Sequence, residues 1–445
     1  SSPSFSPDGK LLVYEKSGGN IFQGYSFGKD PGVYIMNADG SGARKLLDRG
    51  NSPRFSSGSD RIYFLDREGD KKVYKSVDLH GGNEIAHFTS GHTTQFVVSP
   101  DNKWVAFTEL FNVYIAAFPS TGSALELSGT TGALPVSRVS RDAGTCLHWS
   151  GDGGKLHWVL GPEYFSRELR ESFSFVPGAP DELPEVAASG LDIGLELESD
   201  VPEGSIAFKN ARVITMKGDE VIENGTIVIQ ENRIQAVGPS QQVKIPAGAK
   251  VYDVSGKTIM PGMIDVHAHL PSGAGGKSTR AFWPYYANLA FGVTTTHDPS
   301  NNTEMVFTQA EMVRSGRLTG PRIFSTGTVL YGAEGDEKAV INSLEDARSH
   351  LRRLKAVGAF SVKSYNQPRR NQRQQVIAAA RELEMQVVPE GGSTFTHNMS
   401  MILDGHTSVE HNIPITDVYE DVFRLWNASK TSYTPTLIVA YGSQS

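Results

Sequence analysis

The stretch PGMIDVHAHL, residues 261–270, places His267 and His269 directly after an apolar run that is typical of a buried strand. Side chains alternate along a strand, so these two imidazoles point to the same face. A single histidine is more often a packed core residue, but two on one face can bind one metal ion. The stretch therefore predicts a metal site at the end of a strand.

After this stretch, strand-like apolar runs alternate with helical patterns, which favours a parallel sheet covered by helices. The clearest helix is expected at 344–357, because Ser343 and Asp346 form a helix start and Gly358 ends it. Strands are expected near residues 263–267, 293–297, 321–326, 359–363, 386–389, 407–410 and 434–439. This order predicts a (β/α)8 barrel of the TIM type over residues 263–445, with the eighth unit outside the chain.

In such a barrel, side chains at the C-terminal ends of the strands point into the open mouth, where the chemistry takes place. The expected strand ends carry His267, His269, His297, Asp298, Lys363, Glu390 and His411. His297 and Asp298 are candidates for orienting the histidine ligands, and ordinary packing is the alternative. Several segments that lie far apart in the chain are thus expected to meet at one site.

Lys363, in GAFSVKSYN, requires an explanation because an ammonium group beside a bound metal ion would be repelled. Carboxylation by carbon dioxide would convert it into a carbamate whose oxygens bridge two divalent cations. The alternative is a lysine that turns outward or pairs with Glu390. Just beyond it, Tyr365 and Arg369 are candidates for binding substrate, and Arg369 can hold a carboxylate with two hydrogen bonds. Solvent-facing loop residues are the alternative for both.

The first third of the chain repeats a polar turn followed by an apolar strand. The four copies are FSPDGKLLVYE (5–15), FSSGSDRIYFLD (55–66), VSPDNKWVAFTE (98–109) and WSGDGGKLHWVLG (149–161). Their spacing of roughly 40 to 50 residues fits one four-stranded blade per repeat. Residues 1–175 are therefore predicted to form about four blades of a partial β-propeller, with an irregular β-sandwich as the alternative. Charged and aromatic residues such as Arg61, Tyr63 and Trp104 are expected to pack within the blades.

Between these halves, residues 176–204 are rich in proline, glycine and acidic residues and are predicted to be a linker. Residues 205–262 contain short alternating strands, typical of a small antiparallel β-sheet domain. The chain is thus predicted to be multidomain, with a partial propeller, a small β-sandwich and a barrel. Because it opens within a repeat at Ser1, further residues are expected upstream.

The composition excludes several classes of protein. With 445 residues, 38% hydrophobic residues, 20% charged residues and a net charge of −7, the chain is expected to be globular and not to bind nucleic acid. No apolar run is long enough for a membrane span. Cys146 is the single cysteine, which excludes an internal disulfide but leaves the cellular compartment open.

Five motifs occur in an order that is more specific than any of them alone. They are VITMKGDEVIENGTIVIQENRIQAVG (213–238), IMPGMIDVHAHL (259–270), FGVTTTHDPS (291–300), SVKSY (361–365) and TSVEHNI (407–413). Over about residues 205–440 this order resembles the metal-dependent amidohydrolase superfamily, particularly its imidazolonepropionase-like and prolidase-like members. The repeats in front resemble TolB-like propellers, which implies a periplasmic or secreted protein, although a cytoplasmic location stays open.

The resemblance implies one or two divalent ions, expected to be zinc, and a carbamate on Lys363 as their bridge. The metal ligands that it implies are His267, His269, Lys363, Glu390 and His411. Lys363 and His411 are also its predicted catalytic residues. Glu390 is included as a replacement, because the superfamily usually has a histidine at the end of strand five, and His397 is the reserve. The aspartate that serves the superfamily as general base on strand eight has no counterpart in the chain, so the barrel is expected to be truncated.

The expected reaction is hydrolysis of an amide or peptide C–N bond by metal-activated water, as in a dipeptidase. A cyclic amide hydrolase or a deaminase of the same superfamily is a second hypothesis, because both would use the same ligands. A third is an interaction protein with a binding propeller and a vestigial barrel. The expected partner is a small-molecule or short-peptide substrate, and the oligomeric state is left open.

Overall fold

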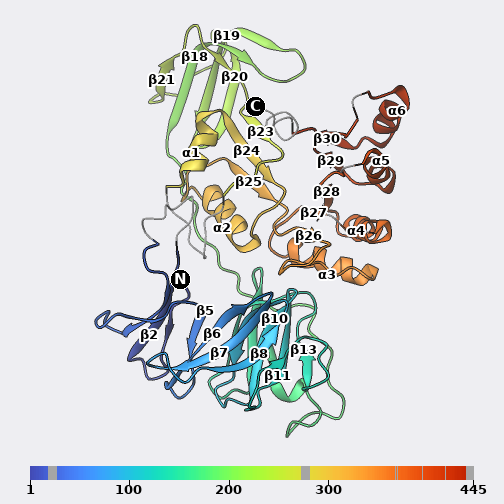
Figure 1. Ribbon diagram of the computed structural model, residues 1–445. Coiled ribbons are helices and arrows are strands. Elements are labelled where there is room, and N and C mark those ends of the chain that lie inside the picture. Colours follow the sequence, from blue (N-terminus) through green and yellow to red (C-terminus); the bar gives the residue numbers. More distant parts are fainter. Residues whose placement is uncertain are drawn as a thin grey trace.

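The computed structural model describes residues 1–18, 28–271, 281–365, 367, 369–392, 394–415 and 417–436. In chain order these residues form four β-sheets, one further mixed sheet, and a series of parallel strands joined by helices (Figure 1). The protein is therefore multidomain and built mostly from strands. None of the described helices is long and apolar enough to cross a bilayer.

Each of the four sequence repeats forms one sheet whose main strands run antiparallel. The first sheet contains β1 (Ser4–Phe5), β2 (Leu11–Lys16), β3 (Gly32–Asn37) and β4 (Arg44–Leu47). The second contains β5 (Asn51–Phe55), β6 (Arg61–Glu68), β7 (Lys71–Asp78) and β8 (Ile85–Ser90), with β12 (Leu125–Glu126) added in parallel. The third contains β9 (Thr93–Val98), β10 (Trp104–Glu109), β11 (Asn112–Ala117) and β13 (Val136–Arg138). The fourth contains β14 (Thr145–Trp149), β15 (Lys155–Leu160), β16 (Glu163–Glu168) and β17 (Leu191–Asp192), and the 3-10 turn Leu169–Glu171 follows β16.

The repeated turn has the same chemistry in every sheet. In the first sheet the Ser6 hydroxyl donates to Asp8 at 2.6 Å and accepts from the Leu11 backbone N–H at 2.9 Å. The equivalent serines of the other three repeats make the same pair of hydrogen bonds, and they are Ser56, Ser99 and Ser150. Such turns set where the second strand of each sheet begins.

The four sheets match the number of blades expected from the sequence, but no closed propeller is detected in the described residues, so the propeller stays a prediction. The aromatic and charged residues expected to pack within the sheets do so. Tyr63 stacks on Tyr74 with ring centroids 5.5 Å apart, and Trp104 stacks on Phe173 at 4.8 Å. Arg61 donates to the backbone carbonyl of Ser76 and to that of Asn83.

The middle of the chain differs from the prediction in two respects. Part of the expected linker, Leu191–Asp192, pairs with β16 and so belongs to the fourth sheet. The expected antiparallel sandwich is, in the described residues, a single mixed sheet in which two strands run parallel to β18. Its strands are β18 (Ser205–Ile214), β19 (Val221–Gln230), β20 (Arg233–Pro239), β21 (Lys250–Asp253) and β22 (Thr258–Ile259).

The remaining strands pair in parallel, as predicted. Their bounds are β23 (Met263–Asp265), β24 (Val293–Asp298), β25 (Arg322–Ser325), β26 (Leu330–Tyr331), β27 (Ser361–Tyr365), β28 (Gln386–Pro389), β29 (Ser408–Glu410) and β30 (Ser432–Thr434). Only β26 was not expected from the sequence, and β30 starts earlier than predicted, while residues 437–439 of that prediction lie outside the described residues. A closed barrel is not seen in the part of the chain that the structure describes and stays a prediction.

Helices separate these strands, and α3–α6 lie along one side of β26–β30 (Figure 1). They are α1 (Trp283–Ala290), α2 (Thr303–Arg314), α3 (Leu344–Lys355), α4 (Arg370–Glu382), α5 (Phe395–Asp404) and α6 (Glu420–Ser429). The helix predicted at 344–357 is confirmed as α3. Ser343 and Asp346 form a reciprocal capping box at its start, and Gly358 follows it with φ +98°.

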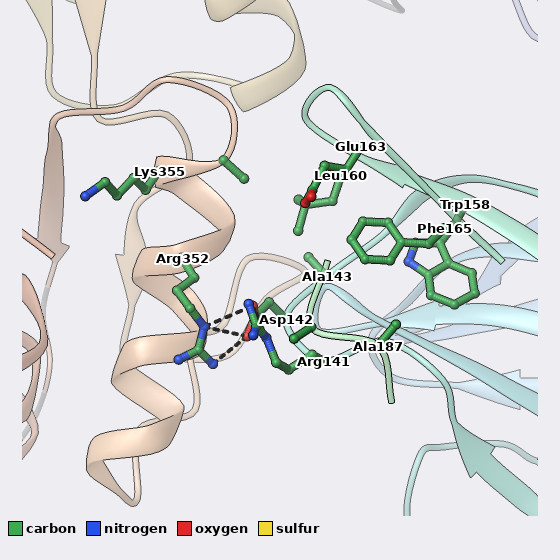
Figure 2. Close-up of a pocket in the computed structure, with 12 residues that line it drawn as sticks. Arg141, Asp142, Ala143, Trp158, Leu160, Glu163, Phe165, Ala187, Arg352 and Lys355 are labelled. Atoms are coloured by element: carbon green, nitrogen blue, oxygen red, sulfur yellow. Dashed lines mark hydrogen bonds and ion pairs between the residues drawn. The ribbon is translucent and has the colours of Figure 1, made fainter. Parts of the chain in front are cut away.

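Helix α3 also joins the two halves of the protein. Figure 2 shows Arg352 of α3 facing Asp142, which lies just before β14, beside a cavity of about 240 Å³. The guanidinium donates to both carboxylate oxygens of Asp142 at 2.7 to 3.1 Å. Next to this pair, the buried guanidinium carbon of Arg353 lies 3.6 Å from the ring centroid of Phe111. The first half of the chain thus packs on the helix that precedes β27 and its residue Lys363.

Candidate functional site

The C-terminal ends of β23, β27, β28 and β29 bring the predicted metal ligands into one cluster. The ring centroid of His267 lies 5.0 Å from that of His269 and 4.9 Å from that of His411. Parallel strands end at the same edge of a sheet, which is why residues from both ends of this half of the chain meet there. The three imidazole rings therefore lie close together, and the metal site expected there stays a prediction.

Glu390, at the end of β28, connects the other two predicted ligands. Its Oε2 atom lies 2.6 Å from Lys363 Nζ, and its Oε1 atom lies 2.8 Å from His411 Nε2. Lys363 is 1% exposed, and its contact with Glu390 is an ion pair without the alignment of a hydrogen bond. The structure thus shows the pairing with Glu390 that was the alternative reading of Lys363, and carboxylation of this lysine stays a prediction.

Glu410, the last residue of β29, belongs to the cluster and was missed by the sequence analysis. Its side chain is 3% exposed, and its Oε2 atom lies 2.5 Å from His267 Nδ1. Burial would raise the pKa of Glu410, but hydrogen bonds from His267 and Ser408 outweigh this effect and lower the pKa. Glu410 is therefore ionised at neutral pH and accepts a hydrogen bond from the N–H of His267 Nδ1. An acidic residue inside the apolar strand SVE was the signal that could have identified it.

This hydrogen bond fixes the orientation of the His267 ring. Its other nitrogen, Nε2, is buried and has no hydrogen-bond partner among the described residues. A ring that donates through one nitrogen to a carboxylate and keeps a lone pair on the other is the arrangement of metal-binding histidines. His267 therefore fits the role of a metal ligand.

Asp298, at the end of β24, holds the segment that carries His269. It accepts hydrogen bonds from the backbone N–H of Leu270 and from the Asn301 side chain, at 3.0 and 2.7 Å, and its Oδ1 atom lies 3.7 Å from His269 Nδ1. Burial raises the pKa of Asp298 to about 6 and lowers the pKa of His269. These contacts agree with an orienting role for Asp298.

His297 points elsewhere. Its Nε2 atom lies 2.8 Å from the hydroxyl of Ser361 on β27, and burial lowers its pKa. His297 therefore links two strands, which is the packing alternative named for it.

His411 has an unusual backbone. Its φ of +65° is rare outside glycine, and its Nδ1 atom lies 2.5 Å from the hydroxyl of Thr436. Such conformations persist only where the surroundings enforce them, and they gather at functional sites. Because Nε2 of His411 faces Glu390, that carboxylate must move before this nitrogen can bind a metal.

The other candidates are less closely connected to the cluster. The ring centroid of Tyr365 lies 6.0 Å from Lys363 Nζ and 5.4 Å from that of Tyr331, with the two rings tilted by 31°. Arg369 lies at the start of α4, where its Nη2 atom donates to Asn342 at 3.4 Å, so its predicted role in binding substrate finds no support in this contact. His397 lies on α5 and makes no contact with the cluster in the described residues. In the same residues, no three His, Cys, Asp or Glu side chains are yet arranged to hold a metal ion.

Comparisons with known proteins find short similarities. No known family profile matches the chain. Imidazolonepropionase of Sphingopyxis alaskensis is 41% identical over 68 residues, which are 15% of this chain and 17% of that enzyme. Allantoinase of Streptomyces avermitilis is 26% identical over 164 residues, which are 37% of this chain and 34% of that enzyme. The chain thus spans about a third or less of the length of these relatives.

Among solved structures, a Xaa-Pro dipeptidase with bound methionine is 21% identical, with a TM-score of 0.45, over 53% of this chain and 67% of that one. The relatives found by sequence are hydrolases that act on C–N bonds. These sequence matches support the relationship of this chain to the amidohydrolase superfamily.

Proposed function

We propose that this chain carries the site of a metal-dependent hydrolase that cleaves C–N bonds in amides. The observation that carries the proposal is His267, whose Nδ1 atom is held by the buried Glu410 carboxylate while its buried Nε2 atom has no partner among the described residues. The ring centroids of His269 and His411 lie 5.0 and 4.9 Å from that of His267. A carboxylate-oriented imidazole with neighbouring imidazoles is a donor set suited to zinc.

The ligands we propose for one or two zinc ions are His267, His269, Lys363, Glu390 and His411. When bound, the metal supplies Lewis acidity toward a substrate carbonyl and toward water. Lys363 would join the ligand set as a carbamate, formed when its neutral amine adds to carbon dioxide and releases a proton. Removing the lysine's positive charge would also end its ion pair with Glu390, which frees that carboxylate to bind metal.

The chain's own residues would prepare the site. Glu410 keeps the proton of His267 on Nδ1, so that the lone pair on Nε2 faces the site. Asp298 fixes the backbone after His269 through its bond from the Leu270 N–H. The neighbouring, mutually tilted rings of Tyr331 and Tyr365 form an aromatic surface next to Lys363, which suits an apolar part of a substrate.

The sequence matches guide the choice of substrate. They include an imidazolonepropionase and an allantoinase, so we propose cyclic amides as the first class to test and dipeptides as the second. The TolB-like identity of the first half and a periplasmic or secreted location remain part of the proposal.

Metal analysis tests this function directly. The purified full chain should hold about one or two equivalents of zinc. The double variant His267→Ala, His269→Ala should lose the metal and the hydrolysis of cyclic amides, whereas the exposed control His80→Ala should keep both. A wild-type chain that folds normally, as judged by circular dichroism, and never retains zinc would instead favour an interaction protein. Native mass spectrometry of the same sample would detect the extra carboxyl group on Lys363.

A further inference from the structure

A second cavity, of about 590 Å³, lies where the first strands of the four repeat sheets meet. Its wall includes residues of β1, β5, β9 and β14, together with Glu304 from α2. The volume lies within the range of small-molecule sites. The cavity is lined by other residues than the histidine cluster, so it is a separate site.

The cavity wall is built in the same way in three of the sheets. In each of these sheets the pairing between the first and second strand shifts register once. The shifts lie between Asn51 and Arg54 on β5, at Thr94 on β9, and between Thr145 and His148 on β14. Such bulges turn side chains away from regular pairing and are frequent next to binding sites. All three bulges lie on the wall of the cavity. The same irregularity in three sheets therefore shapes the cavity.

Two opposite charges on this wall belong to solvent-exposed side chains, Arg54 and Glu304. The guanidinium of Arg54 and the carboxylate of Glu304 form no hydrogen bond or ion pair with any described residue, and they do not pair with each other. Thr108, a residue that is 6% exposed, also lines the cavity.

The rest of the wall is partly apolar. Tyr74 and Phe96 stack with ring centroids 4.6 Å apart, and Leu65 and Leu147 also line the cavity. A ligand that fits this surface has an apolar body and carries both a negative and a positive charge.

We propose that this cavity binds a zwitterionic amino acid or short peptide with an aromatic or apolar side chain. Arg54 holds the carboxylate with charge-assisted hydrogen bonds, Glu304 holds the ammonium group, and the apolar side chain rests against Tyr74 and Phe96. Because Glu304 belongs to the second half of the chain, the ligand would contact both halves. The proposal does not depend on the hydrolase function.

Cys146 makes the test direct, because it is the only cysteine of the chain, is exposed and lines the cavity. L-Phenylalanine is the probe, and the rate of Cys146 alkylation by neutral iodoacetamide in the full chain is the measurement. Phenylalanine should slow alkylation several-fold, with heat of binding seen by calorimetry. Phenylalaninamide, which lacks the carboxylate, and N-acetylphenylalanine, which lacks the ammonium group, should each bind roughly tenfold more weakly.

Variants then assign the two charges. Arg54→Met and Glu304→Gln should each weaken protection of Cys146 roughly tenfold, whereas Arg67→Met, on β6 of the same sheet as Arg54 but outside the cavity, should not change it. The proposal is overturned if phenylalanine leaves the alkylation rate of the wild type unchanged. It is also overturned if phenylalanine slows alkylation of Cys146 in Arg54→Met as much as in the wild type. Binding only at the histidine cluster would give heat without protection of Cys146, and this outcome also refutes the proposal.

Discussion

The pair of Arg352 and Asp142 should be a main energetic link between the two halves of the chain. The Asp142 side chain is 4% exposed, and Arg352 donates three hydrogen bonds to it. Burial would raise the pKa of Asp142, but the bonds from Arg352 and Arg141 outweigh this and lower it below the ordinary 3.8. Replacing Arg352 with methionine keeps an aliphatic stem and removes the charge together with the hydrogen bonds to Asp142 and Glu345.

The expected cost follows from what remains around Asp142. A buried charge left without a partner costs about 3–5 kcal/mol of folding free energy. In Arg352→Met the Nε atom of Arg141 still donates to Asp142 at 2.8 Å, so we expect about 2–3 kcal/mol. Arg352→Met and Asp142→Asn each remove the same contact. The double variant should therefore lose about 2 kcal/mol less free energy of unfolding than the two single variants lose together.

Urea unfolding followed by tryptophan fluorescence measures this coupling, since Trp158 lines the cavity beside the pair (Figure 2). The control is Arg348 with Glu382, whose side chains are 35% and 46% exposed and whose coupling should stay below about 1 kcal/mol. A coupling between Arg352 and Asp142 that is no larger than that of the control would refute the reasoning.

Three further outcomes are expected. Because the folded state lowers the pKa of Asp142, its stabilising coupling should hold from neutral pH down to about pH 4 and fade below, as urea titrations at several pH values would show. Gly161→Val should cost about 2–4 kcal/mol in the same assay, because Gly161 has φ +58° and an added Cβ would lie 2.3 Å from the Ala356 carbonyl; an unchanged midpoint would contradict this. Glu410→Gln should weaken zinc binding about 10- to 100-fold in a chelator competition, since His267 loses its anionic partner, and wild-type affinity would argue against that role.

The fold was predictable where local pattern decides it. Apolar runs between helical patterns located the parallel strands, and the repeated polar turns located the four repeat sheets. Each of these signals is contained within a few consecutive residues. The two-residue strand β26 is too short to show a period, and β17 lies in a segment whose composition resembles a linker. Both form only because a partner strand is already in place.

The sequence predicted which residues lie at the site better than it predicted how their side chains contact one another. The rule that chemistry lies at strand ends identified His267, His269 and His411, and the structure brings their rings together. It could not show that Glu390 faces Lys363 and His411 at once, because that depends on side-chain directions across three strands. Glu410 was missed for a related reason, since its partner His267 is remote in the chain.

The distance along the chain between those two partners has a consequence for assembly. His267 and Glu410 are 143 positions apart, so this hydrogen bond forms only after the intervening strand and helix units have docked. A nascent or partly unfolded chain would therefore lack the oriented imidazole, and zinc would have little to bind until the polypeptide is compact. Zinc would then bind only fully folded molecules and stabilise them against unfolding by mass action. Misassembled copies would not gain this stability.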